Sequence, residues 1–279
     1  MKYKKMEIGY LGPAGTFTEQ VATYIAQEHR CDLIEYPGIP DVIYATHFGD
    51  IQWGVVPIEN SVEGSVTVTL DMLVHDVDVY IVQEVITPIQ QCLLVQPGCH
   101  KEDITLILSH PQALAQCRGY LYENFHGISQ QNTLSTSEAT RLVSVEDRAY
   151  AAIGSKKAAD RFGLQVLDED IQDHKGNSTR FIIISKQEEE PMGECKTSIA
   201  FSVTDRPGSL LEALQIFADA HVNLTRIESR PMKTLLGNYL FLIDMEGSRW
   251  DQRIQDILET IRRKSMFYKF LGSYSTRTI

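Results

Sequence analysis

Gly176-Asn177-Ser178-Thr179-Arg180-Phe181 leads from a polar turn into Ile182-Ile183-Ile184. Three consecutive isoleucines after a phenylalanine predict a buried strand. A hydroxyl and a guanidinium therefore lie where a loop enters a rigid strand, and α/β proteins hold polar groups toward a ligand at such places. The planar fork of Arg180 suits a carboxylate, and Thr179 offers a small donor and acceptor with few rotamers. An ordinary turn ahead of a core strand, with Arg180 solvated, is the equal alternative.

Strand patterns alternate with helical patterns on the N-terminal side of this stretch. The expected strands are residues 7–11, 33–36, 52–58, 79–85, 90–95, 106–108, 164–167 and 181–184. The alternation predicts an α/β domain with mostly parallel sheets. Because Thr179 and Arg180 stand at the start of a strand, they would reach a ligand from a crossover between two lobes. We therefore expect two α/β lobes around a cleft, as in periplasmic solute-binding proteins.

The pattern restarts after a charged segment, Lys186–Glu194, that contains proline and glycine and is typical of a linker. Strands are expected at residues 197–203, 223–229, 239–245 and 266–274, with helices at 208–220 and 251–264. This βαββαβ order is that of a ferredoxin-like domain. The expected organisation is residues 1–185 as the two-lobed domain, 186–196 as the linker and 197–279 as the second domain.

Charge and cysteine content limit the classes of ligand. The 279 residues carry a net charge of −11, and Lys196 onward contributes 12 basic and 9 acidic residues, so the first 195 residues carry −14. This balance argues against a nucleic-acid partner and requires local donors or helix N-termini to capture any anion. The five cysteines show no Cys-x-x-Cys spacing, so neither a metal site nor a disulfide framework is expected. Without a signal-type or membrane-spanning apolar run, the protein is expected to be cytoplasmic and not membrane-bound.

Polar side chains follow several of the expected strands. The residues at these positions are Thr16, Asn60, Ser61, Ser109, His110, Gln112, Thr136, Ser137, Thr179 and Arg180. Ligands bind at the carboxyl ends of strands in open α/β sheets, so we expect these groups to converge on one site. Thr16 and Ser135 each begin a capping box at a helix N-terminus, and Ser109 is expected to cap a third helix. A turn or a cap without any ligand remains the alternative reading of each position.

Six motifs in order carry a family resemblance. They are Gly12–Glu19, Val56–Gly64, Ser109–Leu114, Asn177–Phe181, Arg206–Leu210 and Glu228–Pro231. With these motifs the chain resembles the monofunctional prephenate dehydratases that carry a C-terminal ACT regulatory domain. The resemblance implies conversion of prephenate to phenylpyruvate with loss of water and carbon dioxide, without metal or cofactor. No chorismate mutase helix precedes residue 7, so a fused mutase is not expected.

The resemblance also implies roles for individual residues. It implies that Thr179 is essential for activity. It also implies that the feedback inhibitor L-phenylalanine is bound by Gly208, Ser209, Leu210, Glu228, Ser229, Arg230 and Pro231. Serine replaces the family's alanine at position 209, so the strength of inhibition stays open. ACT domains act in pairs, and a dimer or tetramer is therefore expected.

Mechanistic roles follow from the chemistry of prephenate, which gains an aromatic ring when it fragments. The enzyme has to help the ring hydroxyl leave, so Thr179 is expected to donate a hydrogen bond there, with His110 or Glu63 as the proton source. Substrate contacts are expected from Thr16, Asn60, Ser61, Ser109, Gln112, Ser137, Arg180 and Phe181. Two alternatives stay open: an arogenate dehydratase, and a non-catalytic two-lobed module that binds small anions.

Overall fold

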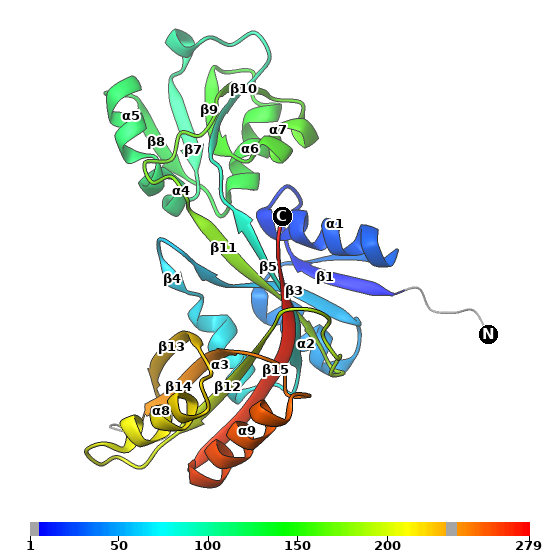
Figure 1. Cartoon of the computed structure of the whole chain (residues 1–279). Helices are drawn as coiled ribbons and strands as arrows, with labels where there is room; N and C mark the ends of the chain where they lie inside the picture. The colour runs from blue at the N-terminus through cyan, green and yellow to red at the C-terminus, as the bar shows by residue number, and fades with distance from the viewer. Residues whose placement is uncertain (1–5, 233–238) are drawn as a thin grey trace, which may run out of the picture.

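The computed structural model describes residues 6–232 and 239–279; the basic N-terminal residues 1–5 lie outside this range. Two lobes and a C-terminal domain follow one another along the molecule, with strands β5 and β11 running between the lobes (Figure 1). The elements of the first lobe are β1 (Glu7–Leu11), α1 (Phe17–His29), β2 (Asp32–Tyr36), α2 (Ile39–Phe48), β3 (Trp53–Asn60), β4 (Gly64–Ser65), α3 (Thr67–His75), β5 (Tyr80–Pro88) and β11 (Ser178–Ser185).

The second lobe is built on a five-stranded sheet of order β10-β6-β9-β7-β8. Its elements are β6 (Cys92–Val95), the 3-10 helix η1 (Lys101–Asp103), β7 (Leu106–Ser109), α4 (Pro111–Gln116), α5 (Arg118–Asn124), β8 (Ser129–Asn132), α6 (Thr136–Val145), β9 (Tyr150–Gly154), α7 (Lys156–Phe162) and β10 (Gln165–Asp168). The edge strand β8 has the exposed sequence Ser-Gln-Gln-Asn, and the periodicity of the sequence does not reveal it.

The C-terminal domain has the predicted βαββαβ order. Its elements are β12 (Cys195–Ser202), α8 (Ser209–Asp219), β13 (Leu224–Pro231), β14 (Tyr239–Glu246), α9 (Gln252–Lys264) and β15 (Phe267–Thr278). Because α8 and α9 both present apolar stripes, they pack together on one face of the sheet around Phe201, Phe217 and Ile257. The first strand begins at Cys195, inside the segment expected to be the linker.

The α/β class is confirmed, but the expectation of mostly parallel sheets is wrong in detail. β1 pairs in parallel with β2 and β3, whereas β11 lies antiparallel between β3 and β5. In the second lobe β6 pairs antiparallel with β9 and β10. The physical reason is that β5 leaves the first lobe and β11 returns to it, so the two crossover strands must run in opposite directions. Both sheets are therefore mixed.

One sheet of ten strands joins the first lobe to the C-terminal domain. The end of β15 pairs in parallel with β5 from Ser275 to Thr278, which gives the order β13-β14-β12-β15-β5-β11-β3-β1-β2, with β4 beside β3. Gly272 permits this approach, because a Cβ there would lie 2.2 Å from the carbonyl oxygen of Ile81. The two regions therefore share a backbone hydrogen-bond ladder.

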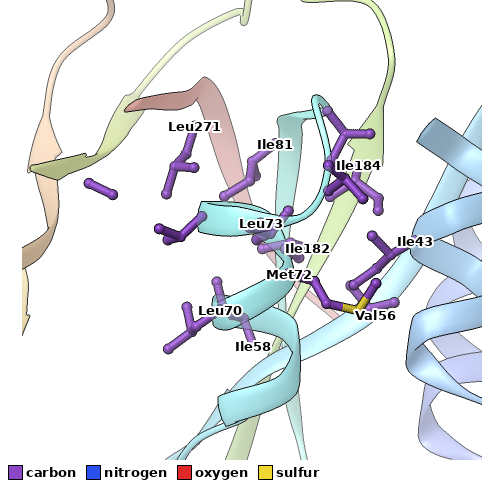
Figure 2. Packing of buried hydrophobic residues seen from close by; sticks show 14 of the residues in the cluster. Ile43, Val56, Ile58, Leu70, Met72, Leu73, Ile81, Ile182, Ile184 and Leu271 are labelled. Carbon is purple, nitrogen blue, oxygen red and sulfur yellow. The ribbon is translucent and has the colours of Figure 1, made fainter. Parts of the chain in front are cut away.

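A shared apolar core reinforces this ladder (Figure 2). Ile182 and Ile184 of β11 pack in the same cluster as Leu70 of α3, and Leu242 and Leu271 of the C-terminal domain complete it. Phe181 and Ile183, on the other face of β11, belong to a second cluster beneath α1. β11 is buried on both faces, which explains its continuous apolar run.

Candidate active site

The cleft between the two lobes contains a cavity of about 840 Å³. The first lobe contributes the β1–α1 turn and the segment from Asn60 to Val66, and the second lobe contributes the starts of α4 and α6. Thr179 and Phe181 of β11 line its floor. Nine residues expected from the sequence line the cavity: Thr16, Asn60, Glu63, His110, Gln112, Thr136, Ser137, Thr179 and Phe181.

Thr179 is held by a buried amide. Asn60 Nδ2 donates to Thr179 Oγ1 at 2.9 Å and to Asn177 Oδ1 at 2.9 Å. The orientation of this amide is fixed, because Asn60 Oδ1 accepts the backbone N–H groups of Val62 and Glu63 at 3.0 and 3.2 Å. Thr179 Oγ1 therefore accepts, and its own hydroxyl hydrogen finds no protein acceptor within the described residues. Since Thr179 is 8% exposed and lines the cavity, that hydrogen is available to a ligand.

Arg180 does not line the cavity. The prediction that it contacts a substrate carboxylate is therefore wrong. Successive side chains of a strand point to opposite faces, and Thr179 and Phe181 take the face toward the cavity. The β-bulge between Arg180 and Phe181, opposite β3, adds local twist at this point. The guanidinium consequently points away from the cleft, toward the C-terminal domain.

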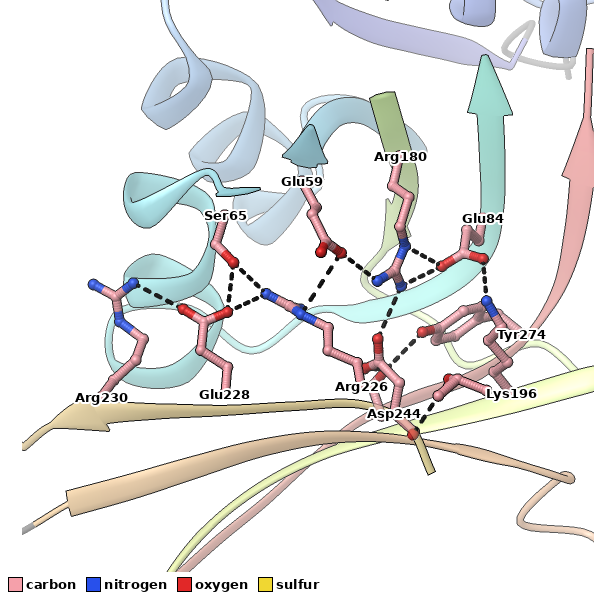
Figure 3. Close-up of polar contacts among 12 residues, drawn as sticks. Glu59, Ser65, Glu84, Arg180, Lys196, Arg226, Glu228, Arg230, Asp244 and Tyr274 are labelled. Carbon is pink, nitrogen blue, oxygen red and sulfur yellow. Dashed lines mark hydrogen bonds and ion pairs between the residues drawn. The ribbon is translucent and has the colours of Figure 1, made fainter. Parts of the chain in front are cut away.

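Three carboxylates surround Arg180 (Figure 3). Its guanidinium donates to Glu59 at 2.6 Å, to the fully buried Glu84 through Nε at 2.8 Å, and to Asp244 at 2.8 Å. Lys196 also donates to Glu84, at 2.7 Å. Burial lowers the pKa of Arg180, but Asp244, Tyr274 and Glu84 outweigh it and raise the pKa overall, so the side chain stays charged. This arginine has no free donor face for a substrate.

Glu63 of the first lobe and His110 of the second lobe both line the cavity. Desolvation raises the pKa of Glu63, and the charge of His110 and a hydrogen bond with Gln112 oppose only part of this rise. His110 is the N-cap of α4, and its Nδ1 accepts the backbone N–H of Gln112 at 3.3 Å. While that bond holds, Nδ1 carries no proton and Nε2 is the donor atom of the ring.

Two further expected residues lie outside the cavity. Ser109 is fully buried, and its hydroxyl donates to the carbonyl of Ile153 at 2.7 Å. It neither caps α4 nor meets a ligand, because it is the last residue of β7 and its side chain is turned into the core. Ser61 is exposed behind the site, where its Oγ accepts the backbone N–H of Ser178 at 2.9 Å.

Two long helices begin at the cavity. Thr16 caps α1, accepting from Glu19 N at 3.3 Å and donating to Leu11 O at 3.2 Å, so its hydroxyl is fully used. Ser135 caps α6, and Ser137 donates its hydroxyl across the cleft to the carbonyl of Ala14. The predicted N-caps therefore form, but the reciprocal half of each capping box is shifted by one residue, because Glu19 accepts from Gly15 N at 2.6 Å and Glu138 from Leu134 N at 2.7 Å. Helix starts, which favour anions, lie on both sides of the cleft.

Arg141 is a cavity-lining residue that the sequence reading missed. It lies one turn after Ser137 on α6, and within the described residues it has no ion-pair partner. A search at i+4 from the expected substrate-binding residue Ser137 would have found it. The cavity also contains Glu35 and Glu138, whose carboxylates accept the backbone N–H groups of Ala14 at 3.2 Å and Leu134 at 2.7 Å. Arg141 is therefore a free cation among carboxylates.

Between residues 6–232 and 239–279, no group of three or more His, Cys, Asp or Glu side chains could hold a metal ion. No helix in these ranges has the length and apolar character needed to cross a membrane.

Comparison with known families shows to which family the chain belongs. A model of the prephenate dehydratase family matches residues 8–189, and a model of the ACT domain matches residues 197–263. The chain belongs to the prephenate dehydratase family. A prephenate dehydratase of Methanocaldococcus jannaschii is 39% identical over 274 residues, which cover 95% of this chain and 96% of the relative. The expected family and the C-terminal ACT domain are thus confirmed.

Solved structures agree with this membership of the prephenate dehydratase family. The prephenate dehydratase of Arthrobacter aurescens in complex with L-Phe is 36% identical, with a TM-score of 0.88 over 97% of this chain and 90% of that one. A structure described as a novel type of quorum-quenching acylase is 28% identical, with a TM-score of 0.82 over 96% of this chain and 97% of that one. The fold alone therefore does not fix the reaction, and the residues of the site have to carry that argument.

The two motifs to which the family resemblance assigns effector binding lie on the ACT domain. Gly208 is the N-cap of α8, with a positive φ of 86°, and Ser209 lines a small cavity of about 280 Å³. On β13, Ser229 and Pro231 are exposed, whereas Glu228 and Arg230 alternate toward the catalytic region.

Glu228 and Arg230 both contact that region in this single chain. Glu228 accepts from Ser65 at 2.5 Å, and Arg230 pairs with Asp71 at 3.0 Å. Two of the four residues of the predicted effector motif Glu228–Pro231 thus face the first lobe.

Proposed function

We propose that the cleft converts prephenate to phenylpyruvate, with loss of water and carbon dioxide, and that Thr179 acts on the leaving hydroxyl. The observation that supports this role is the Asn60–Thr179 hydrogen bond, which turns the hydroxyl hydrogen of Thr179 toward the cavity. Membership of the prephenate dehydratase family supports the choice of reaction.

The reaction needs a proton at the hydroxyl oxygen and no added electrons. The bond from the ring to its carboxylate breaks, carbon dioxide leaves, and the electron pair enters the ring. As the ring becomes aromatic, its bond to the hydroxyl breaks, and the hydroxyl takes a proton and leaves as water. Thr179 donates a hydrogen bond to that oxygen but is too weak an acid to supply the proton.

We assign the proton to Glu63. Desolvation raises the pKa of its carboxyl, which is the direction that a general acid requires, and Glu63 lines the cavity. His110 is less suited, because its Nδ1 serves as the helix cap and leaves Nε2 as a hydrogen-bond donor. In this assignment His110 and Gln112 hold the substrate or the Glu63 carboxyl in place, and neither transfers the proton.

Local donors capture the two carboxylates of prephenate. Arg141 is the free guanidinium of the cavity, and the first turn of α6 presents backbone N–H groups that have no partner inside the helix. The N-terminal end of this helix favours an anion. Phe181 and neighbouring apolar residues form an apolar wall of the cavity. Such surroundings favour dispersal of the ring carboxylate's charge.

Arogenate is the second candidate substrate, because the cavity contains carboxylates that could pair with its ammonium group. Two of them, Glu35 and Glu138, are already bonded to backbone N–H groups, so we expect prephenate to be preferred. Turnover of the two substrates by the same preparation, compared as kcat/KM, decides between them.

Feedback inhibition by L-phenylalanine at paired ACT domains is part of the proposal. The L-Phe complex of the Arthrobacter aurescens relative supports the ligand. Strand β13 is an end strand of the ten-stranded sheet, so a second copy could extend the sheet there. We propose a homodimer, or a tetramer built from it, located in the cytoplasm.

The role of Thr179 is tested with Thr179→Ala and Thr179→Ser. Loss of a preorganised donor typically costs about 10²–10³ in kcat, so we expect that loss for the alanine variant. The serine variant keeps the hydroxyl and should retain most of the turnover. Phenylpyruvate formation is followed by ultraviolet absorbance. Near-normal turnover by Thr179→Ala would contradict the proposal.

A further inference from the structure

Two pairs of charged residues meet where the ACT sheet covers the back of the catalytic strands. Arg226 of β13 lies opposite Asp244 of β14, and Glu59 of β3 lies opposite Arg180 of β11. Asp244 bonds Arg180 at 2.8 Å, Arg226 approaches Glu59 at 3.7 Å, and Glu59 bonds Arg180 at 2.6 Å (Figure 3). We call these four residues the charge joint.

The charge joint lies directly behind the catalytic pair. Asn60 and Thr179 are the next residues after Glu59 and before Arg180, and they too lie opposite each other across β3 and β11. Their side chains line the cavity, while those of Glu59 and Arg180 point to the ACT domain. A shift of either joint strand therefore displaces the backbone that holds the Asn60–Thr179 hydrogen bond.

The same ACT strand also reaches the rim of the cavity. Arg226 donates to Ser65 at 2.8 Å and to Glu228 at 2.5 Å, and Ser65 in turn donates to Glu228. Ser65 lines the cavity on the hairpin that carries Glu63. Arg226 consequently bonds the predicted effector motif on one side. On the other side it contacts Glu59, the residue before Asn60, and Ser65, which lines the cavity.

Burial makes these contacts sensitive to displacement. The side chain of Arg226 is 8% exposed and that of Asp244 is 5% exposed. Charges in such surroundings are weakly screened, and a lost pairing is not replaced by water. A change at Glu228 that moves Arg226 thus acts on Glu59 and Ser65 together.

We propose that Arg226 couples the effector site to the catalytic cavity. L-Phenylalanine at the ACT domain would shift β13, and Arg226 would transmit the shift through Glu59 to Asn60 and through Ser65 to the Glu63 hairpin. This inference rests on the proposed feedback inhibition. Coupling of this kind is a free energy between two sites, separable from the affinity of either site.

The test compares Arg226→Gln with the wild type in the full-length oligomer. Calorimetry measures binding of L-phenylalanine, and steady-state kinetics measure inhibition. We expect binding to remain within about threefold, while the ratio of prephenate affinities with and without effector falls toward one from about 5–150. By reciprocity, prephenate should also cease to change the affinity for L-phenylalanine. Arg263→Gln, which removes an exposed arginine paired within α9, is the matched control and should keep full coupling.

Several outcomes overturn the inference. If the L-phenylalanine concentrations that inhibit the wild type also inhibit Arg226→Gln, the coupling takes another route. Equal losses of binding and inhibition would make Arg226 part of the effector site instead. If Arg226→Gln does not fold, Arg226→Lys keeps the charge without the fork, and unchanged coupling in it would also reject the proposal. Absence of inhibition in the wild type contradicts the proposed feedback function instead.

A double-variant cycle tests the route through Glu59. If Arg226 acts through that carboxylate, Glu59→Gln and Arg226→Gln together reduce coupling no further than Arg226→Gln alone. If the losses of coupling in the two single variants multiply in the double variant, the two residues act independently. The proposed route from Arg226 through Glu59 would then be wrong.

Discussion

Thr179 and Arg180 are neighbours in the chain but face opposite sides of β11, one toward the cleft and one toward the ACT domain. The motif therefore combines the proposed donor for the substrate with a residue that bonds the regulatory domain. The alternation of side chains along a strand dictates this division. The sequence reading identified the motif correctly and assigned both residues to one site, because it did not apply that alternation to a strand start.

Glu63 determines the pH dependence that we expect. Its pKa is raised by desolvation, and in the proposed mechanism the protonated form is the active one. Activity should therefore be present at low pH and fall as the pH rises through this pKa. Glu63→Gln should lower kcat by about 10²–10⁴ and remove that limb of the profile of kcat/KM against pH. A profile unchanged by the substitution would assign the proton to another group.

Arg141 should affect binding of the substrate more than its conversion. Loss of one exposed carboxylate contact costs on the order of 1–2 kcal/mol, so Arg141→Gln should raise KM about tenfold and leave kcat within threefold. Steady-state kinetics with prephenate measure the split. A fall in kcat at unchanged KM would place Arg141 in the chemical step instead.

At the scale of elements, Arg180 connects strands that are distant in the sequence. Its partners come from β3, β5 and β14, and Lys196 of β12 shares Glu84 with it. A buried carboxylate is tolerated here only because two cations face it. This arrangement could not be read from the chain, since no local pattern marks Glu84 as the partner of Arg180.

Arg180→Met should therefore destabilise the protein strongly. The variant leaves the buried Asp244 without its cation and Glu84 with Lys196 alone, and breaking such a pair costs about 3–5 kcal/mol of unfolding free energy. Urea unfolding measures the loss. Arg263→Gln, at an exposed ion pair, should change the unfolding free energy by no more than about 0.5 kcal/mol. Similar small losses for both variants would show that the Arg180 cluster contributes little to stability.

At the scale of the molecule, one sheet and one core run from the first lobe into the ACT domain. Movement of the ACT domain cannot then be independent of the catalytic strands. Its other surface carries exposed apolar side chains, with Ile227 49%, Leu211 68% and Tyr239 52% exposed. We expect this surface, next to the free edge of β13, to be covered by a second copy.

Ile227→Lys should weaken that association. The charge would be buried in the interface, so we expect the variant to dissociate at concentrations where the wild type is a dimer or tetramer, and to lose response to L-phenylalanine. Sedimentation velocity measures the assembly. Phe48→Lys changes another exposed apolar residue, 68% exposed at the end of α2, and should leave assembly intact. Equal assembly of both variants would move the interface elsewhere.

The sequence by itself determined most of the element order, the ACT domain, the capped helix starts and nine of the residues that line the cavity. These features depend on local periodicity and on motifs of adjacent residues, which are properties of the chain. Only the tertiary structure decided that Ser109 is turned into the core, that Arg141 enters the cavity and that Arg180 holds the ACT domain. Those outcomes depend on which strands become neighbours, and the long-range pairing of β3, β5, β11 and β14 has no local signature in the sequence.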